Sequence, residues 1–307
     1  MTRPDQRVVI IVGAPRSGTS LLYKLLCTHP DANYLSNWNR RFPRLSVLAS
    51  LRHVANRRTD RRDAVWFPGS NAYVAGRRAF RDRLFPMPVE ADAFYAACGV
   101  YDSRRSGTPG RRSVEQRLSA RLQAVMRAGS GTHLFLKCIA NNAHLATLLG
   151  AYPDATVVDI TRDGRAVAAS LARVDWWPDL ELWWWHGTPR DWQAAGRDPM
   201  EACARHWLAE VQRLREVLGQ LARHDANRVL SLRYEDLVAS PTTVLDAVAT
   251  YTGLRPDPAW LARAARVPAA IGRPARPPDS AIVEQVQAEM LRELGYPPRE
   301  LSSEFSS

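Results

Sequence analysis

Residues 7–20, which read Arg-Val-Val-Ile-Ile-Val-Gly-Ala-Pro-Arg-Ser-Gly-Thr-Ser, decide the fold. The run Arg7–Val12 is rich in β-branched residues and ends in a Gly/Pro turn, which is typical of a buried parallel strand. Leucines at positions 21, 22, 25 and 26 follow at helical spacing, and His29-Pro30-Asp31 ends that pattern. The stretch therefore predicts a strand, a tight loop and a helix.

The loop between them, Gly13–Ser20, is the sharpest motif of the chain. Free backbone N–H groups and the helix dipole make such a junction a phosphate site. Its spacing fits the P-loop pattern, but Thr19 stands where the Walker lysine belongs. That lysine serves the β- and γ-phosphates of a nucleoside triphosphate, so ordinary ATP hydrolysis is disfavoured. Arg16 supplies a cation from another direction. The alternative is a tight Gly-rich turn without a ligand.

Further along, β-rich runs alternate with helical ones. Strands are expected at His133–Lys137, Ala155–Thr161 and Asn227–Leu232, with helices at Arg165–Arg173, Met200–Arg223 and Thr242–Thr252. Alternation of this kind favours parallel pairing with helices on both faces. The fold class predicted is α/β: a parallel-sheet, P-loop-like three-layer domain with helical insertions. Residues 1–307 are read as a single domain.

Two stretches interrupt the alternation. Residues 39–128 are rich in arginine, contain helical pieces and lack an obvious core strand, so we interpret them as an insertion between the first and second strands. Residues 176–207 hold seven of the ten tryptophans and are broken by Pro and Gly, which suits a lid. The predicted role of these rings is to stack on a ligand with an extended apolar or sugar face. A homodimer surface, where aromatic residues are also enriched, is the competing explanation.

The composition restricts the class of protein. The net charge is +11, and 40 of the 42 basic residues are arginine. A positive field concentrates polyanions, but no nucleic-acid-binding motif is present, so no nucleic-acid partner is expected. The four cysteines lack metal spacing, and no apolar run is long enough for a membrane span. These features predict a cytoplasmic protein with reduced thiols and no metal.

A second motif is Ile160-Thr161-Arg162-Asp163-Gly164-Arg165, followed by Ser170. Groups at the carboxyl ends of parallel strands point into the ligand crevice. A guanidinium and a hydroxyl converging there suit a second phosphate, because arginine binds phosphate bidentately. The alternative pairs Arg162 with Asp163 or Asp159 and leaves Ser170 on a helix surface.

Together the segments PRSGTS and RDGRAVAAS resemble the 5′-phosphosulfate loop and the 3′-phosphate segment of the PAPS-dependent sulfotransferases. Leu232–Leu237 with Ser240-Pro241, and the closing Glu289–Tyr296, are similar to later stretches of that family. The resemblance implies transfer of a sulfuryl group from PAPS, without a metal, to a hydroxyl or less often an amine. The implied acceptor is a small molecule, a lipid or a carbohydrate.

The resemblance also implies which residues form the site. Pro15, Arg16, Ser17, Gly18, Thr19, Ser20, Arg162 and Ser170 would bind PAPS, with Tyr234 near the adenine and Arg273 closing over the 3′-phosphate. Lys137 and Arg16 would be catalytic. Lys137 stands out because lysine is so rare in this chain, and a compact ammonium suits charge on a leaving oxygen. Lys24, the other lysine, is expected to face solvent.

The general base is left open. Ile139 occupies the position where some relatives have a histidine, and Leu35-Ser36-Asn37 offers no carboxylate where others have a glutamate. His186, His133, Glu90 and Asp175 are the candidates. A small-molecule kinase and a non-catalytic basic polyanion-binding protein are the alternative functions.

Overall fold

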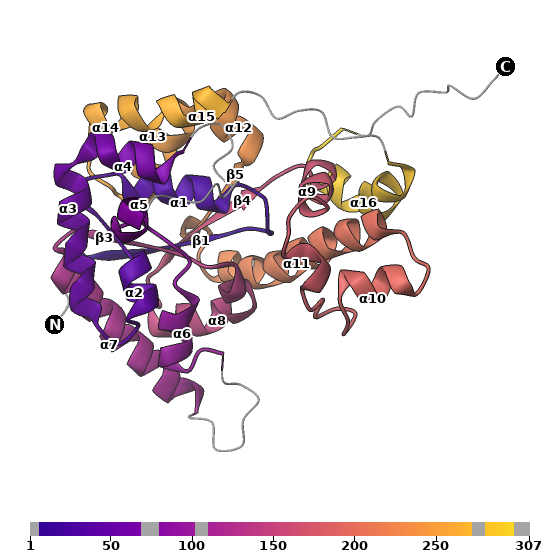
Figure 1. The fold of residues 1–307 in the computed structure, drawn as a ribbon, viewed down its shortest axis with the longest axis horizontal. Helices are drawn as coiled ribbons and strands as arrows, with labels where there is room; N and C mark the ends of the chain where they lie inside the picture. The colour runs from indigo at the N-terminus through magenta and orange to yellow at the C-terminus, as the bar shows by residue number, and fades with distance from the viewer. Residues whose placement is uncertain (1–5, 69–79, 102–109, 272–279, 298–307) are drawn as a thin grey trace.

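One parallel sheet forms the centre of the computed structural model, which describes residues 6–68, 80–101, 110–271 and 280–297 (Figure 1). Its strand order is β2-β3-β1-β4-β5, and every pair is parallel. The strands are β1 (Arg7–Val12), β2 (Ala32–Tyr34), β3 (His133–Lys137), β4 (Thr156–Thr161) and β5 (Val229–Arg233).

Helices connect the strands and cover both faces of the sheet (Figure 1). The α-helices are α1 (Thr19–Cys27), α2 (Asn37–Arg41), α3 (Arg52–Arg57), α4 (Thr59–Trp66), α5 (Phe80–Leu84), α6 (Asp92–Cys98), α7 (Arg111–Gly129), α8 (Leu145–Ala151), α9 (Gly164–Leu171), α10 (Pro189–Ala194), α11 (Pro199–His224), α12 (Tyr234–Ala239), α13 (Pro241–Thr252), α14 (Pro258–Ala264), α15 (Arg266–Ile271) and α16 (Ala281–Glu293). Short 3-10 helices are η1 (Ser46–Leu51), η2 (Ile139–His144), η3 (Trp177–Asp179) and η4 (Ala226–Arg228).

Alternation along β1 divides the interior into two cores. Successive side chains of a strand point to opposite faces. Val9 and Ile11 therefore pack with α1, α4, α12, α13 and α14, whereas Val8, Ile10 and Val12 pack with α6, α7, α8 and α11. A third core joins α9, α10, α11 and α16 beside the sheet (Figure 1). The three-layer α/β fold class predicted from the sequence is confirmed.

The four predicted strands are present within two residues of the expected bounds. A fifth strand, β2, was missed, because Ala-Asn-Tyr is short and has no β-branched residue. Residues 39–128 separate the first two predicted strands, β1 and β3, and β2 lies between α1 and the start of this stretch.

The strands that follow β1 in the chain are first added on one side of it and then on the other. Strands β2 and β3 lie on one side of β1, and β4 and β5 lie on the other. Such a switch point opens a crevice at the carboxyl ends of the strands, where α/β proteins bind ligands. In the part of the chain that is described, no helix has the length and apolar character that crossing a membrane requires.

The four cysteines are buried as free thiols, one or two in each core: Cys27 in the first, Cys98 and Cys138 in the second, and Cys203 in the third. Burial raises the pKa of each of these thiols.

Candidate active site

The loop between β1 and α1 has the backbone that its glycines predict. Gly18, the N-cap of α1, has a φ of 91°, and a Cβ added there would overlap the ring of Tyr234. Glycine is therefore required for both conformation and space. The hydroxyl of Ser17 is buried beneath the loop, where no described residue bonds it. An unpaired buried hydroxyl at a helix N-terminus suits an anionic ligand.

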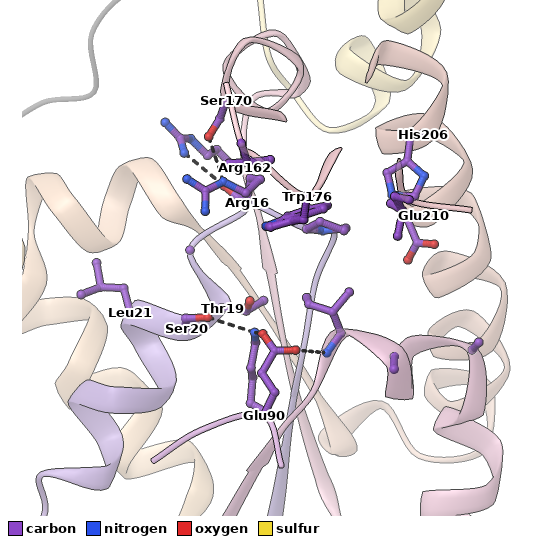
Figure 2. A pocket seen from close by; sticks show the side chains of 18 of the residues that line it. Arg16, Thr19, Ser20, Leu21, Glu90, Arg162, Ser170, Trp176, His206 and Glu210 are labelled. Atoms are coloured by element: carbon purple, nitrogen blue, oxygen red, sulfur yellow. Dashed lines mark hydrogen bonds and ion pairs between the residues drawn. The ribbon is translucent and has the colours of Figure 1, made fainter. Parts of the chain in front are cut away.

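Three segments converge beside this loop (Figure 2). Arg16 Nε donates to Ser170 Oγ of α9 at 3.0 Å, and Arg162 Nη1, just after β4, donates to the Arg16 carbonyl at 3.1 Å. The Arg162 guanidinium lies 4.4 Å from the ring centroid of Tyr234, and its buried Nε has no partner among the described residues. Two cations and a hydroxyl thus meet at one side of the crevice.

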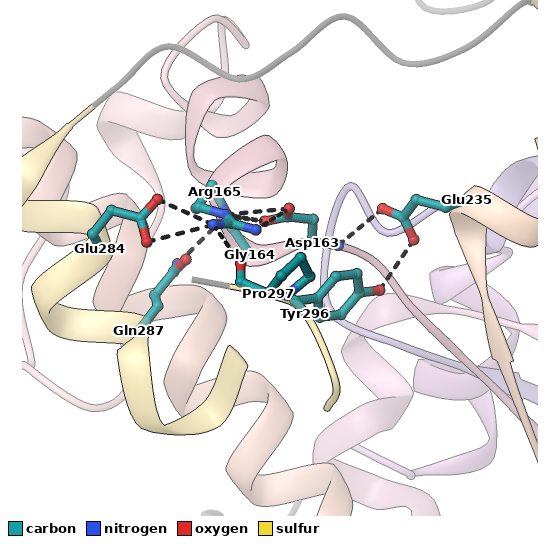
Figure 3. Close-up of polar contacts among 8 residues, drawn as sticks. All are labelled: Asp163, Gly164, Arg165, Glu235, Glu284, Gln287, Tyr296 and Pro297. Carbon is teal, nitrogen blue, oxygen red and sulfur yellow. Dashed lines mark hydrogen bonds and ion pairs between the residues drawn. The ribbon is translucent and has the colours of Figure 1, made fainter. Parts of the chain in front are cut away.

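Arg162 is left available because its neighbour Asp163 pairs elsewhere (Figure 3). Asp163 caps α9 and forms an ion pair of 2.8 Å with Arg165 Nη2. Arg165, which is 6% exposed, also contacts Glu284 of α16 at 3.1 Å and the Pro297 carbonyl at 3.1 Å. The alternative in which Arg162 pairs with Asp163 is therefore not what the structure shows.

A lysine–carboxylate pair lies across from the arginines. Lys137 ends β3 and is 3% exposed; its ammonium donates to Ser20 Oγ at 2.9 Å and forms an ion pair with Glu90. Glu90 Oε2 accepts from the backbone N–H of Ile139 at 3.0 Å. Glu90 reaches this place because Val89 N–H donates to the Leu35 carbonyl at 3.1 Å, which holds the insertion along the end of β2.

One cavity of about 1060 Å³ is lined on one side by Arg16, Arg162 and Ser170 and on the other by Lys137 and Glu90. This volume is at the upper end of the range for ligand pockets, which is about 300–1,000 Å³. Most residues predicted for the site line it: Pro15, Arg16, Gly18, Thr19, Ser20, Lys137, Arg162, Ser170 and Tyr234. Ser17 lies beneath the loop, and Arg273 falls outside the described residues.

Of the four candidate bases, Glu90 lines the cavity and the other three do not. His133 begins β3, at the end of the strand away from the crevice, and its Nε2 lies 3.1 Å from the Thr252 carbonyl oxygen. His186 and Asp175 are exposed outside the cavity.

The prediction that Lys24 faces solvent was wrong. Lys24 is half-buried, lines the cavity, and donates to the Trp66 carbonyl at 3.0 Å. Its helical position looked exposed because α4, which covers it, lies in the insertion.

The far side of the cavity contains residues that no motif indicated. His206, Glu210 and Arg213 of α11 line it together with Trp176 and Trp183, whose exposed fractions are 49% and 38%. Figure 2 shows His206 and Glu210 on α11 and Trp176 between them and the arginine cluster. Their spacing on α11 placed them on one helix face, but the sequence gave no sign that this face borders a cavity.

Comparison with known proteins gives a family and a fold. A model described as sulfotransferase family matches residues 8–258. The crystal structure of sulfotransferase STF9 from Mycobacterium avium aligns with a TM-score of 0.55 at 17% identity, covering 95% of this chain and 77% of that one. Sulfotransferase STF1 from Mycobacterium tuberculosis H37Rv gives 0.54 at 18%, covering 92% and 76%. At these identities the likeness concerns the fold. Among curated proteins, no sequence matches this chain.

Proposed function

The chain belongs to the sulfotransferase family, and from that premise we propose that it transfers a sulfuryl group from PAPS to a hydroxyl of a small-molecule, lipid or carbohydrate acceptor. Family and fold support sulfotransfer in general. The donor and the acceptor are inferred from the site. The observation that carries the proposal is one cavity with the Arg16 loop, Arg162 and Ser170 on one side and a Lys137–Glu90 pair on the other.

The residues present fit a donor that carries a 5′-phosphosulfate and a 3′-phosphate. The loop amides at the start of α1, which no side chain caps, suit the first group. Arg162, with its unpaired Nε, and Ser170 suit the second. When bound there, PAPS would supply the sulfuryl group, and Tyr234 would border the base.

Lys137 and Glu90 would share the proton and charge movements. Glu90 would take the acceptor hydroxyl's proton while the acceptor oxygen forms its bond to sulfur. The bond from sulfur to the bridging phosphate oxygen would break, and Lys137 would stabilise the charge on that oxygen. Because protonation removes the negative charge of Glu90, its attraction for Lys137 would weaken. The ammonium would then be freed for the leaving oxygen at the moment that oxygen needs it.

The geometry does not favour a kinase. Thr19 occupies the position of the lysine that serves β- and γ-phosphates, and its side chain is 3% exposed. Lys137 approaches Ser20 from β3 and is held by Glu90, so its charge is already shared with a carboxylate.

Thermal unfolding tests the donor. A ligand that binds only the native state raises its melting temperature. Adenosine 3′,5′-bisphosphate should stabilise the protein, whereas ATP with Mg²⁺ and duplex DNA should have little effect. Equal stabilisation by ATP with Mg²⁺ would favour the kinase, and stabilisation by DNA alone would favour a polyanion-binding protein.

A further inference from the structure

One ring nitrogen of a buried imidazole on the far side of the cavity has no partner among the described residues. His206 is 3% exposed, and Trp184 Nε1 donates to its Nδ1 at 3.3 Å. Because Nδ1 accepts from the indole N–H, the proton of the neutral ring is on Nε2, and burial, which lowers the pKa of this histidine, favours that neutral form. No described residue accepts from that Nε2–H. A buried donor without a partner is costly, which points to a ligand.

Glu210, one helical turn further along α11, is held as an acceptor. Its Oε1 accepts from Trp183 Nε1 at 2.8 Å and lies 3.6 Å from Arg213 Nη1. Its Oε2 accepts from Asn142 Nδ2 at 3.3 Å, and the same amide donates to the Gly13 carbonyl at 3.0 Å. Two carboxylate oxygens accept about four hydrogen bonds, so Glu210 retains capacity toward the cavity.

Two tryptophan rings complete this wall. Trp176 and Trp183 are the tryptophans with the largest exposed fractions among the described residues, and both line the cavity. The Arg213 guanidinium lies 3.3 Å from the Trp183 ring centroid, and Glu210 holds the indole N–H, so this ring is fixed before a ligand arrives. A fixed, half-exposed ring provides a flat apolar face at little entropic cost.

We propose that this wall, made of His206, Glu210, Arg213, Trp176 and Trp183, binds a polyhydroxylated, sugar-like acceptor. His206 donates to a hydroxyl oxygen, Glu210 accepts from a hydroxyl, and the C–H face of the ring packs on tryptophan. The inference rests on the proposed function, because this wall and the Lys137–Glu90 pair belong to the same cavity.

Other acceptor chemistries match the wall less well. A carboxylate would meet the charge of Glu210, and an ammonium would meet Arg213 and the N–H of His206. A hydrocarbon alcohol has a single hydroxyl, which the proposed transfer places at Glu90, so it would leave His206 Nε2–H unpaired. A hydroxyl satisfies both neighbours because it donates and accepts.

Calorimetry can test the wall before the natural acceptor is known. The probes are methyl β-D-glucopyranoside, methyl α-D-mannopyranoside and maltose, compared with cyclohexanol, each with and without saturating adenosine 3′,5′-bisphosphate. At least one glycoside should bind tenfold more tightly than cyclohexanol. His206→Phe should weaken that glycoside at least tenfold and leave the bisphosphate unaffected. His206→Gln, which restores an N–H donor, should recover part of the loss. His224→Phe, at the exposed end of α11, is the matched control.

The proposal is overturned if cyclohexanol binds as tightly as every glycoside, if nothing in the panel binds, or if His206→Phe leaves glycoside affinity unchanged. Glycoside binding that depends on His206 while the bisphosphate fails to bind supports this wall and contradicts the proposed donor. The two failures are therefore distinguishable.

Discussion

At the scale of single residues, Arg162 provides the clearest test of the donor site. Its guanidinium is held by the Arg16 carbonyl and the Tyr234 ring, and no described acidic side chain neutralises it. Arg162→Ala should weaken binding of adenosine 3′,5′-bisphosphate by about 1.5–3 kcal/mol, the value of a charge-assisted contact. Calorimetry measures this, with Arg127→Ala on the exposed side of α7 as control. Unchanged affinity in folded Arg162→Ala would remove the residue from the site.

Replacement of Glu90 tests the proposed proton transfer separately from binding of the bisphosphate. Glu90→Gln keeps the shape of the side chain and one of the two oxygens that accept from Lys137 and the Ile139 N–H, but it cannot take a proton. We expect turnover to fall by about 10²–10⁴ with affinity for the bisphosphate within twofold, and the acidic limb of the pH–rate profile to disappear. Glu216→Gln, exposed on α11, should leave turnover unchanged. A normal profile in Glu90→Gln would place the base elsewhere.

Local sequence predicted that Arg16, Arg162 and Ser170 lie together, because each follows a strand whose carboxyl end meets the same crevice; their part in binding a donor remains a prediction. Lys137 was found through its rarity. Glu90 could only be one of four candidates, since residues 35–37 and 88–90 become neighbours through the fold. His206 and Glu210 had the appearance of ordinary residues on an amphipathic helix.

At the scale of elements, Arg165 fastens α16 to the start of α9, next to Arg162. Arg165→Leu leaves Asp163 and Glu284 without their shared cation and removes the bond to the Pro297 carbonyl. Unfolding free energy should fall by about 2–3 kcal/mol, because truncating one member of a buried ion network exposes the others' desolvation cost.

Urea denaturation checks this value. Arg205→Leu, which breaks an exposed i,i+4 pair with Glu201 on α11, should cost less than about 0.5 kcal/mol. Equal losses of unfolding free energy in the two variants would show that the network around Arg165 stabilises the fold no more than an exposed ion pair does.

Strand β4 contributes a pH dependence through Asp159. Burial raises the pKa of its carboxyl to about 7, with Arg215 opposing the shift. Between pH 4 and pH 7 the folded protein keeps a proton that the unfolded chain has released, so rising pH lowers the unfolding free energy. Asp159→Asn should remove about 1–2 kcal/mol of that loss.

The measurement compares urea denaturation at pH 5 and pH 8 in both proteins. The unfolding free energy of Asp159→Asn, relative to that of the wild type, should be higher at pH 8 than at pH 5. A constant difference between the two proteins at both values would mean that Asp159 does not carry the effect.

The strands themselves were predictable because four of them are β-branched or apolar runs that end in turns. The order of the sheet was not, because nothing in Ala-Asn-Tyr marks an edge strand. The prediction that Lys24 faces solvent was wrong for a related reason. The exposure of a residue depends on which distant segment covers it, and Lys24 is covered by α4.

At the scale of the molecule, the tryptophans distinguish a ligand-responsive wall from a subunit interface. Among those of the 176–207 stretch, Trp177, Trp192 and Trp207 are buried in the third core, while Trp176 and Trp183 face the cavity. Adding bisphosphate and then an acceptor should shift or quench the emission at fixed protein concentration.

The Trp176→Phe/Trp183→Phe double variant should lose most of this response. Emission that follows protein dilution and ignores ligands would instead assign the rings to a dimer surface, the competing explanation that the sequence left open.

The distribution of the thiols has a practical consequence. Each core holds at least one buried cysteine, and burial keeps the reactive thiolate scarce by raising its pKa. A thiol reagent therefore labels a core only while that core is open. Mass spectrometry of peptides containing Cys27, Cys98, Cys138 and Cys203 would then record three opening rates in one experiment. The four thiols thus report separately on the opening of the three cores. A ligand that closes the cavity should slow the labelling of Cys203 more than the labelling of Cys27.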